Sequence, residues 1–181
     1  MRSTRRLRQN SPPATQPADG VRTPRLFVSD DARQLIAREA ALYRDVETGG
    51  ILMGHFEAAD AIHVTHASGP GSNAVHEPAF FLRDTAYCAG VLREHYERFG
   101  ADYVGEWHTH VDGLRVPSPG DLLTLAGIMH DPDYDFESFA MLLAVKFRRR
   151  RSRLDLHAFV ATKNLVMQTT VEELVTQNGG R

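Results

Sequence analysis

Two histidines one residue apart are the residues of this sequence whose types and spacing most directly indicate chemistry. His108 and His110 follow the apolar, β-prone run 103–105, and alternate residues of a strand face the same way, so we expect both imidazoles on one face. Asp121 stands just before the apolar run 122–129, which predicts a helix. Two neutral nitrogens and one carboxylate are a ligand set of catalytic zinc, with the fourth position left for water.

Three other interpretations of the histidine pair have to be weighed against the sequence. A site like that of the metallo-β-lactamases needs the pattern HxHxDH, and Asp112 fits it, but Gly113 replaces the last histidine. Barrel amidohydrolases also place HxH at a strand end, but their eight βα units need about 250 residues, and this chain has 181. In the third interpretation the two histidines are merely half-buried strand residues.

The elements that must position these residues are helices and mostly hairpin-connected strands. We expect helices over 32–44 and from Thr85 to about Phe99, each preceded by capping residues, and a third helix that begins near Pro119. Besides the histidine strand, β-prone runs predict strands over 26–28, 51–53, 62–66, 80–82, 139–147 and 154–161. A short closing helix is expected over 169–177. These elements together predict an α+β fold with a sheet flanked by helices.

Charge and proline content divide the chain into three parts. Residues 1–25 carry six arginines against the single acid Asp19, although the whole chain has a net charge of −2. Residues 1–24 hold several prolines and few large apolar side chains, so we expect a disordered basic leader there. One domain should span residues 25–168, and residues 169–181 should form a C-terminal tail or short helix. The acidic remainder makes nucleic acid an unexpected main substrate.

Cysteine content and hydropathy limit the class of protein and its location. Cys88 is the only cysteine, which excludes an internal disulfide and a cysteine-rich zinc module. A single thiol fits a reducing compartment, so we expect a cytoplasmic protein. No apolar run approaches the roughly 20 residues that a membrane-spanning helix needs, and we expect no membrane partner.

A longer pattern appears when the histidines are read together with an acid much earlier in the chain. Its parts are Glu47-Thr48-Gly49-Gly50, Ile51-Leu52-Met53-Gly54, His108-x-His110, seven residues, Ser118, two residues and Asp121. This pattern resembles the JAMM (MPN-plus) zinc metallopeptidase family, in particular its bacterial stand-alone members. The resemblance covers approximately residues 26–161. It implies an MPN/JAMM-like (cytidine-deaminase-like) mixed sheet flanked by helices.

The resemblance also implies a role for each residue of the pattern. The implied zinc ligands are His108, His110 and Asp121, the implied general base is Glu47, and the implied oxyanion-stabilising residue is Ser118. On its own, Glu47 would be interpreted as a surface acid between a helix and a strand. Glu106 is a competing base because it shares the face of the two histidines. It lies one strand step further from the metal, about 7 Å per two residues, so we expect it to have a structural role.

One residue departs from the family pattern. The family usually has a proline directly after the second histidine, and Val111 stands there in this chain. The residue at this position shapes the following loop and binds no metal. The change therefore bears on loop conformation and substrate fit, and leaves the expected zinc ligands intact.

Members of the family hydrolyse the peptide or isopeptide bond after the C-terminal glycine of ubiquitin or a ubiquitin-like protein. The resemblance thus implies a deubiquitinase-like hydrolase in a bacterial ubiquitin-like conjugation system, including antiphage systems, with E1-like and E2-like enzymes as partners. Residues 111–117 and 67–78 are the expected walls of the substrate groove. Two rival hypotheses are a zinc-less MPN scaffold and a zinc hydrolase that acts on a sulfur-carrier precursor or a small amide.

Overall fold

A computed structural model describes residues 24–57, 61–111, 113–147 and 154–174. The predicted basic leader therefore lies, except for Pro24, outside the described residues. The helices are α1 (Asp30–Leu42), α2 (Thr85–Phe99) and α3 (Pro119–Met129). The strands are β1 (Arg25–Val28), β2 (Gly49–Glu57), β3 (Ala61–Ala67), β4 (Val75–Glu77), β5 (Phe80–Leu82), β6 (Asp102–His110), β7 (Phe139–Lys146), β8 (Leu154–Ala161), β9 (Val166–Thr169) and β10 (Val171–Glu173).

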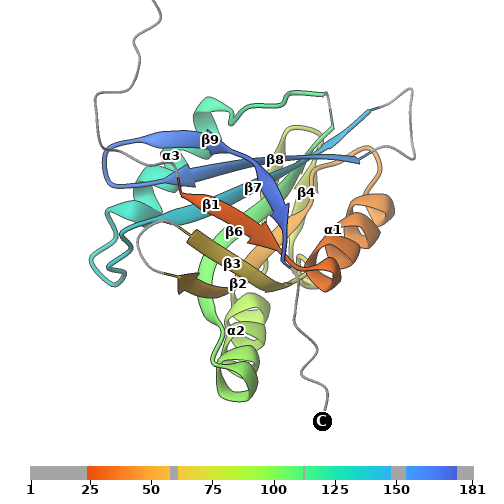
Figure 1. The fold of residues 1–181 in the computed structure, drawn as a ribbon. Coiled ribbons are helices and arrows are strands. Elements are labelled where there is room, and N and C mark those ends of the chain that lie inside the picture. The colour runs from red at the N-terminus through yellow and green to blue at the C-terminus, as the bar shows by residue number, and fades with distance from the viewer. Residues whose placement is uncertain (1–23, 58–60, 112, 148–153, 175–181) are drawn as a thin grey trace, which may run out of the picture.

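Eight of the strands form one mixed sheet (Figure 1). Its order is β10-β1-β3-β2-β6-β7-β8-β9. The pairs β10–β1, β1–β3 and β6–β7 are parallel, and the others are antiparallel. The parallel pair β6–β7 needs a crossover connection, and α3 supplies it. The predicted α+β class with a mixed sheet flanked by helices is confirmed.

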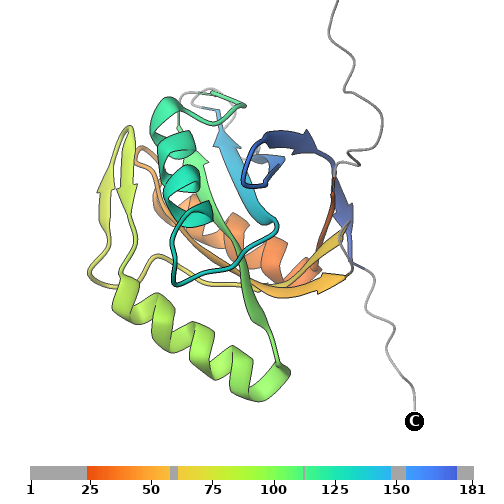
Figure 2. The same cartoon turned by 90° about the vertical axis from the view of Figure 1, so that its left-hand side faces the viewer.

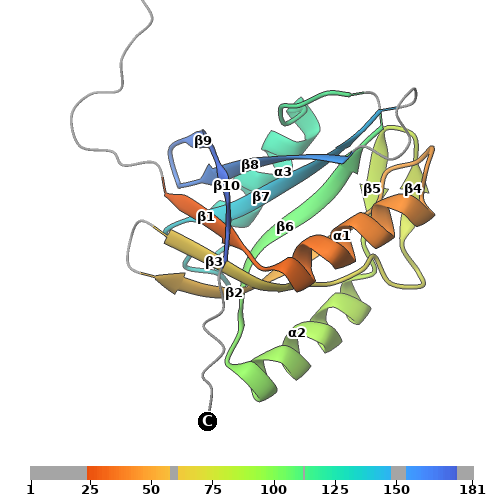
Figure 3. The same cartoon turned by 45° about the vertical axis from the view of Figure 1, so that its right-hand side comes forward.

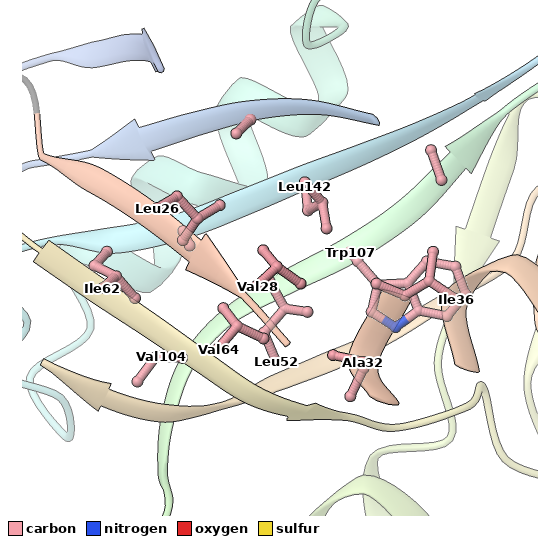
Figure 4. Packing of buried hydrophobic residues seen from close by; sticks show 14 of the residues in the cluster. Leu26, Val28, Ala32, Ile36, Leu52, Ile62, Val64, Val104, Trp107 and Leu142 are labelled. Carbon is pink, nitrogen blue, oxygen red and sulfur yellow. The ribbon is translucent and has the colours of Figure 1, made fainter. Parts of the chain in front are cut away.

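The helices cover both faces of this sheet. Figure 3 shows α1 in front of the sheet, α3 behind it and α2 below. Alternation along β7 explains how one strand serves both layers. Leu142 packs in the cluster that includes Ile36 of α1, whereas Leu143 packs in the cluster that includes Leu125 of α3. Figure 4 shows the α1-side cluster, in which Trp107 lies beside Ile36.

The remaining strand pair stands apart from the main sheet. Strands β4 and β5 form a two-stranded antiparallel hairpin, in which Val75 pairs with Leu82 and Glu77 with Phe80. In Figure 2 this hairpin, drawn in yellow, stands beside α3 and above α2. The sequence predicted only its second strand, because the first lies within a segment rich in turn residues.

Local capping explains where the helices begin and end. Ser29 caps α1 by accepting a hydrogen bond from the Ala32 amide at 3.2 Å, and Asp84 caps α2 through the Tyr87 amide at 3.1 Å. Gly100 ends α2 with φ of 64°, a left-handed conformation that favours glycine. Within the described residues, no helix is both long enough and apolar enough to cross a membrane.

The predicted closing helix over 169–177 is wrong for the residues that the structure describes. Residues 171–173 form β10, which pairs in parallel with β1, so that Leu26 lies opposite Val171. The Leu174 amide also donates to the Val28 carbonyl at 3.1 Å. An edge strand offers a row of unpaired backbone groups, and pairing with them outweighs weak local helix propensity. The sheet thus extends beyond residue 168, the predicted end of the domain.

Candidate metal centre

Both histidines of the pair lie on one face of β6, as strand alternation predicts. The His108 and His110 Nε2 atoms are 3.1 Å apart. Their side chains are 13% and 5% exposed, so water reaches the pair from one side. Thr109, between them, is fully buried on the opposite face, where its hydroxyl accepts a hydrogen bond from the Thr48 amide at 3.0 Å. This bond and the strand pairing hold the backbone that carries the two rings.

Asp121 reaches the histidines from the first turn of α3. Its two carboxylate oxygens lie 3.2 Å from His108 Nε2 and 3.3 Å from His110 Nε2. Ser118 and Asp121 form a capping box: the Asp121 amide donates to Ser118 Oγ at 3.2 Å, and the Ser118 amide donates to the Asp121 carboxylate at 2.6 Å. The cap that starts the helix therefore also holds the carboxylate at the histidines.

These three side chains have the donor chemistry of a metal site. One ligand atom from each of His108, His110 and Asp121 lies within 4.8 Å of the other two. His110 Nδ1 lies 2.9 Å from the Leu114 carbonyl, which places a proton on Nδ1 and directs Nε2 towards the cluster. Across the described ranges, no other group of three such side chains is as close. The residues present fit a metal ion that takes nitrogen and oxygen ligands.

The charges of the cluster also favour a cation. Burial alone would raise the pKa of Asp121, but hydrogen bonds with His108 and His110 hold that pKa well below its usual range. Burial alone would lower the pKa of His110, and the hydrogen bond with Asp121 reverses this and raises it. An aspartate that stays ionised is a ready metal ligand.

Glu47 faces the cluster from the segment that precedes β2. The register places Gly49 opposite His108, so Glu47 lies close to the end of the histidine strand. The approach of the strands is very close: a Cβ atom on Gly49 would lie 2.3 Å from the Trp107 carbonyl oxygen. Burial raises the pKa of Glu47, while the nearby His108 and His110 lower it. A carboxylate with a raised pKa beside a metal site suits a proton-transfer role.

The competing acid Glu106 is occupied by other contacts. It forms an ion pair with Arg83 and accepts a hydrogen bond from the Tyr103 hydroxyl at 2.5 Å. Tyr103 and Glu106 are three residues apart, yet they meet because the β2–β6 register shifts between Leu52 and Met53. The expected structural role of Glu106 agrees with this geometry.

A cleft of about 400 Å³ lies over the cluster and Glu47. The two predicted groove walls contribute in part, through Val111, Leu114 and Pro78. The larger wall is the β4–β5 hairpin, whose residues 78–82 all line the cleft. Phe80 and Leu82 are half exposed there, at 50% and 54%. Val111, which stands where proline is usual in the family, is buried with 4% exposure.

Two residues near Glu47 were not predicted from the sequence. His76 of β4 donates through Nδ1 to the Glu47 carbonyl at 2.9 Å, and its ring stacks on Tyr43 at 4.0 Å. Lys146, the last residue of β7, donates to the carbonyls of Tyr43 and Val46. The one available signal was a lysine at the end of an otherwise apolar strand, and this signal does not indicate which segment the lysine contacts.

Comparison with known proteins gives consistent results. The family model described as prokaryotic homologs of the JAB domain matches residues 29–157. The chain is 27% identical over 111 residues to the probable metalloprotease y4qB of Sinorhizobium fredii, covering 60% of this chain and 68% of that protein. The solution structure of protein DSY2949 from Desulfitobacterium hafniense superposes with a TM-score of 0.63 at 16% identity, covering 86% of this chain and 99% of the other. That likeness shows the shared fold.

Proposed function

The chain belongs to the JAB-domain (JAMM/MPN) family of metalloprotease-like hydrolases, and we propose that it is a zinc-dependent peptidase or isopeptidase. Its substrate is a ubiquitin-like protein, cut after the C-terminal glycine. The observation that carries the proposal is the convergence of His108, His110 and Asp121 beside Glu47 at the base of one cleft. We propose that it acts in the cytoplasm, within a bacterial ubiquitin-like conjugation system of the kind that includes antiphage systems. E1-like and E2-like enzymes would be its partners there.

Each residue of the cluster has a stated part in this proposal. His108, His110 and Asp121 hold the zinc ion, which when bound acts as a Lewis acid on the scissile carbonyl and lowers the pKa of water. The Glu47 carboxylate accepts a proton from the attacking water and later delivers it to the leaving amine. Burial raises the pKa of Glu47, which makes its carboxylate a stronger base and helps it accept the proton from the attacking water.

Ser118 serves the helix and the reaction through different atoms. Its oxygen accepts a hydrogen bond from the Asp121 amide. A hydroxyl has one proton to donate as well, and we propose that this proton stabilises the negative charge that develops on the substrate carbonyl oxygen. Because Ser118 is the N-cap of α3, its hydroxyl is held at the edge of the cleft.

The shape of the cleft supports an extended, glycine-ended substrate. The wall formed by the β4–β5 hairpin offers strand backbone and exposed apolar side chains, including Phe80 and Leu82. An extended peptide can bind by adding to the edge of such a hairpin. Only glycine lets the substrate backbone come close to the His108–His110 pair, because any Cβ atom would increase the separation.

The test is cleavage of a ubiquitin-like protein that ends in Gly-Gly and is fused to a reporter. We expect the zinc-loaded chain to cut after the second glycine and a chelator to stop the reaction. Glu47→Gln should reduce kcat by about 10²–10⁴-fold and retain bound zinc, because only the proton carrier is lost. Metal analysis of each purified variant measures whether zinc is still bound.

Glu106→Gln is the matched control for Glu47→Gln. It changes a second glutamate that lines the same cleft but is engaged by Arg83 and Tyr103, so its kcat should remain within a few-fold of the wild type. A larger loss in Glu106→Gln than in Glu47→Gln would assign the base to Glu106. Failure to cut both this fusion and an isopeptide-linked conjugate, with zinc bound, would favour a hydrolase of another amide. A chain that binds no zinc would favour the scaffold hypothesis.

A further inference from the structure

One lysine beside the cleft has no part in the chemistry described above. Lys146 is half-buried at the end of β7, and its ammonium donates hydrogen bonds to the Tyr43 carbonyl and, at 2.8 Å, to the Val46 carbonyl. Both carbonyls belong to the segment 43–48, which connects α1 to β2 and carries Glu47. The neighbouring Val145 pairs with His110, so the lysine stands next to the end of the histidine strand.

The backbone around Glu47 is also held by the β4–β5 hairpin and by β6. The hydrogen bonds are from Glu47 N–H to the Glu77 carbonyl at 2.8 Å, from His76 Nδ1 to the Glu47 carbonyl at 2.9 Å, and from Thr48 N–H to Thr109 Oγ1 at 3.0 Å. Lys146 binds the carbonyl of the peptide group that precedes Glu47, and Glu77 accepts from the N–H of the same group. The segment lies between two regular elements and belongs to neither, so these contacts hold the backbone that carries the carboxylate.

The charge of Lys146 also acts on the carboxylate. Burial lowers the pKa of Lys146 to about 8, an effect that Glu47 and Asp45 oppose, so the ammonium remains largely protonated at neutral pH. Burial raises the pKa of Glu47, and Lys146 is one of the cations that lower it, together with His108 and His110. Lysine and glutamate thus stabilise each other's charged forms.

We propose that Lys146 is a positioning residue for Glu47: its ammonium clamps the carbonyls of Tyr43 and Val46 and thereby holds the Glu47 carboxylate at the His108–His110–Asp121 cluster. This inference rests on the proposed role of Glu47 as the general base. Lys146 acts through the backbone of the segment 43–48 and takes no proton in the reaction.

The first test measures the segment directly and needs no substrate. Hydrogen–deuterium exchange of the full-length chain should become about ten- to a hundredfold faster in peptides covering 43–48 when Lys146→Met removes the donors, since a hydrogen bond to a charged group is lost. Lys163→Met is the matched control, because Lys163 pairs with the exposed Asp135 outside the cleft. Unchanged exchange at 43–48 in Lys146→Met, or an equal change in Lys163→Met, would overturn the proposal.

The second test uses the zinc-loaded chain and the Gly-Gly fusion reporter. Lys146→Met should lower kcat by about 10–100-fold with KM and zinc content unchanged, because a misplaced base slows the chemical step and leaves binding intact. Lys146→Arg, which keeps a cationic donor, should restore most of kcat. In a Glu47→Gln background, Lys146→Met should cause no further loss, as expected for two residues that act as one unit. A full additional loss in that background would contradict the proposal.

The outcomes separate this inference from the proposed function. If the wild type cuts no reporter, the proposed substrate fails, while the exchange experiment still tests Lys146. A second outcome is an active wild type, an inactive Glu47→Gln variant, and a Lys146→Met variant with wild-type kcat and exchange. In that case the inference about Lys146 fails and the proposed function stands. Lys146→Gln, which keeps an uncharged N–H donor, is measured in parallel so that poor folding of Lys146→Met leaves the test intact. An intermediate kcat supports the clamp, and a wild-type kcat would contradict a clamp made by the ammonium.

Discussion

At the scale of single residues, Asp121 is held by two kinds of partner. Its carboxylate contacts the rings of His108 and His110, and it also accepts a hydrogen bond from the Ser118 amide. These contacts lower the pKa of Asp121 and, in return, raise the pKa of His110. The ionised aspartate and the protonated histidine therefore stabilise the folded chain when no metal is bound.

This mutual stabilisation predicts a pH window. A carboxyl with a depressed pKa adds stability above its unfolded value of about 3.9, and a histidine with a raised pKa adds stability below about 6.5. The stability difference between the metal-free wild type and Asp121→Asn should thus be largest between roughly pH 4 and 6.5, shrinking on both sides. Urea unfolding of both proteins from pH 3 to 8 measures it. A difference that is constant with pH would contradict the assignment.

At the scale of elements, the close approach of β2 and β6 brings Glu47 to the histidines. Gly49 allows this approach, because a Cβ atom there would lie 2.3 Å from the Trp107 carbonyl oxygen of β6. A Cβ atom on Gly50 would lie equally close to the carbonyl oxygen of Ser68, which follows β3. The pairing of Thr48 with Thr109 continues the contact beyond the glycines, with the Thr109 amide 2.7 Å from the Thr48 carbonyl. The two strands are therefore a single support for the proposed base and for two of the proposed ligands.

A methyl group at Gly49 should disturb both stability and activity. Gly49→Ala forces β2 away from the Trp107 carbonyl, so we expect a loss of about 1–3 kcal/mol in the free energy of unfolding and a lower kcat. Gly127→Ala is the control, because its Cβ would meet nothing within 4 Å on α3. That change should raise the free energy of unfolding by about 0.5–1 kcal/mol. Urea titrations of both variants test the opposite signs.

At the scale of the whole molecule, the last described strand, β10, pairs with β1 and forms one edge of the sheet. Val171 of β10 packs against the α1-side core, and Glu172 forms a two-point ion pair with Arg25, at 2.9 and 2.6 Å. That ion pair is exposed and adds little, so the stabilisation comes mainly from strand pairing and from burial of Val171. At the opposite edge, Val166 of β9 is 40% exposed.

These two edges should respond differently to the same substitution. Val171→Asp places a charge against the apolar core and should lower the free energy of unfolding by about 2–3 kcal/mol, with a corresponding fall in Tm. Val166→Asp, on the exposed edge strand, should change it by about 0.5 kcal/mol or less. Thermal unfolding of the two variants compares them. Equal effects would mean that β10 contributes no more to stability than the opposite edge does.

Local patterns predicted the placement of the proposed ligands, and the resemblance to a family supplied Glu47. Strand alternation placed His108 and His110 on one face, and the spacing of Ser118 and Asp121 is that of a capping box. The parts that it missed depend on contacts between distant segments. The sequence offers no local sign that Lys146 reaches Val46, that β10 pairs with β1, or that a register shift turns Tyr103 towards Glu106.

The β4–β5 hairpin has a further consequence for how such a protein can diversify. Its outward side chains, among them Val75, Phe80 and Leu82, belong to none of the three core clusters. Their identities can change without repacking the interior, whereas the backbone at His76 and Glu77 is tied to Glu47. In the proposed function, substrate recognition and chemistry therefore depend on separate parts of the molecule. Replacing the tip of the β4–β5 hairpin should change which substrate is bound, while the residues proposed to carry out the reaction stay the same.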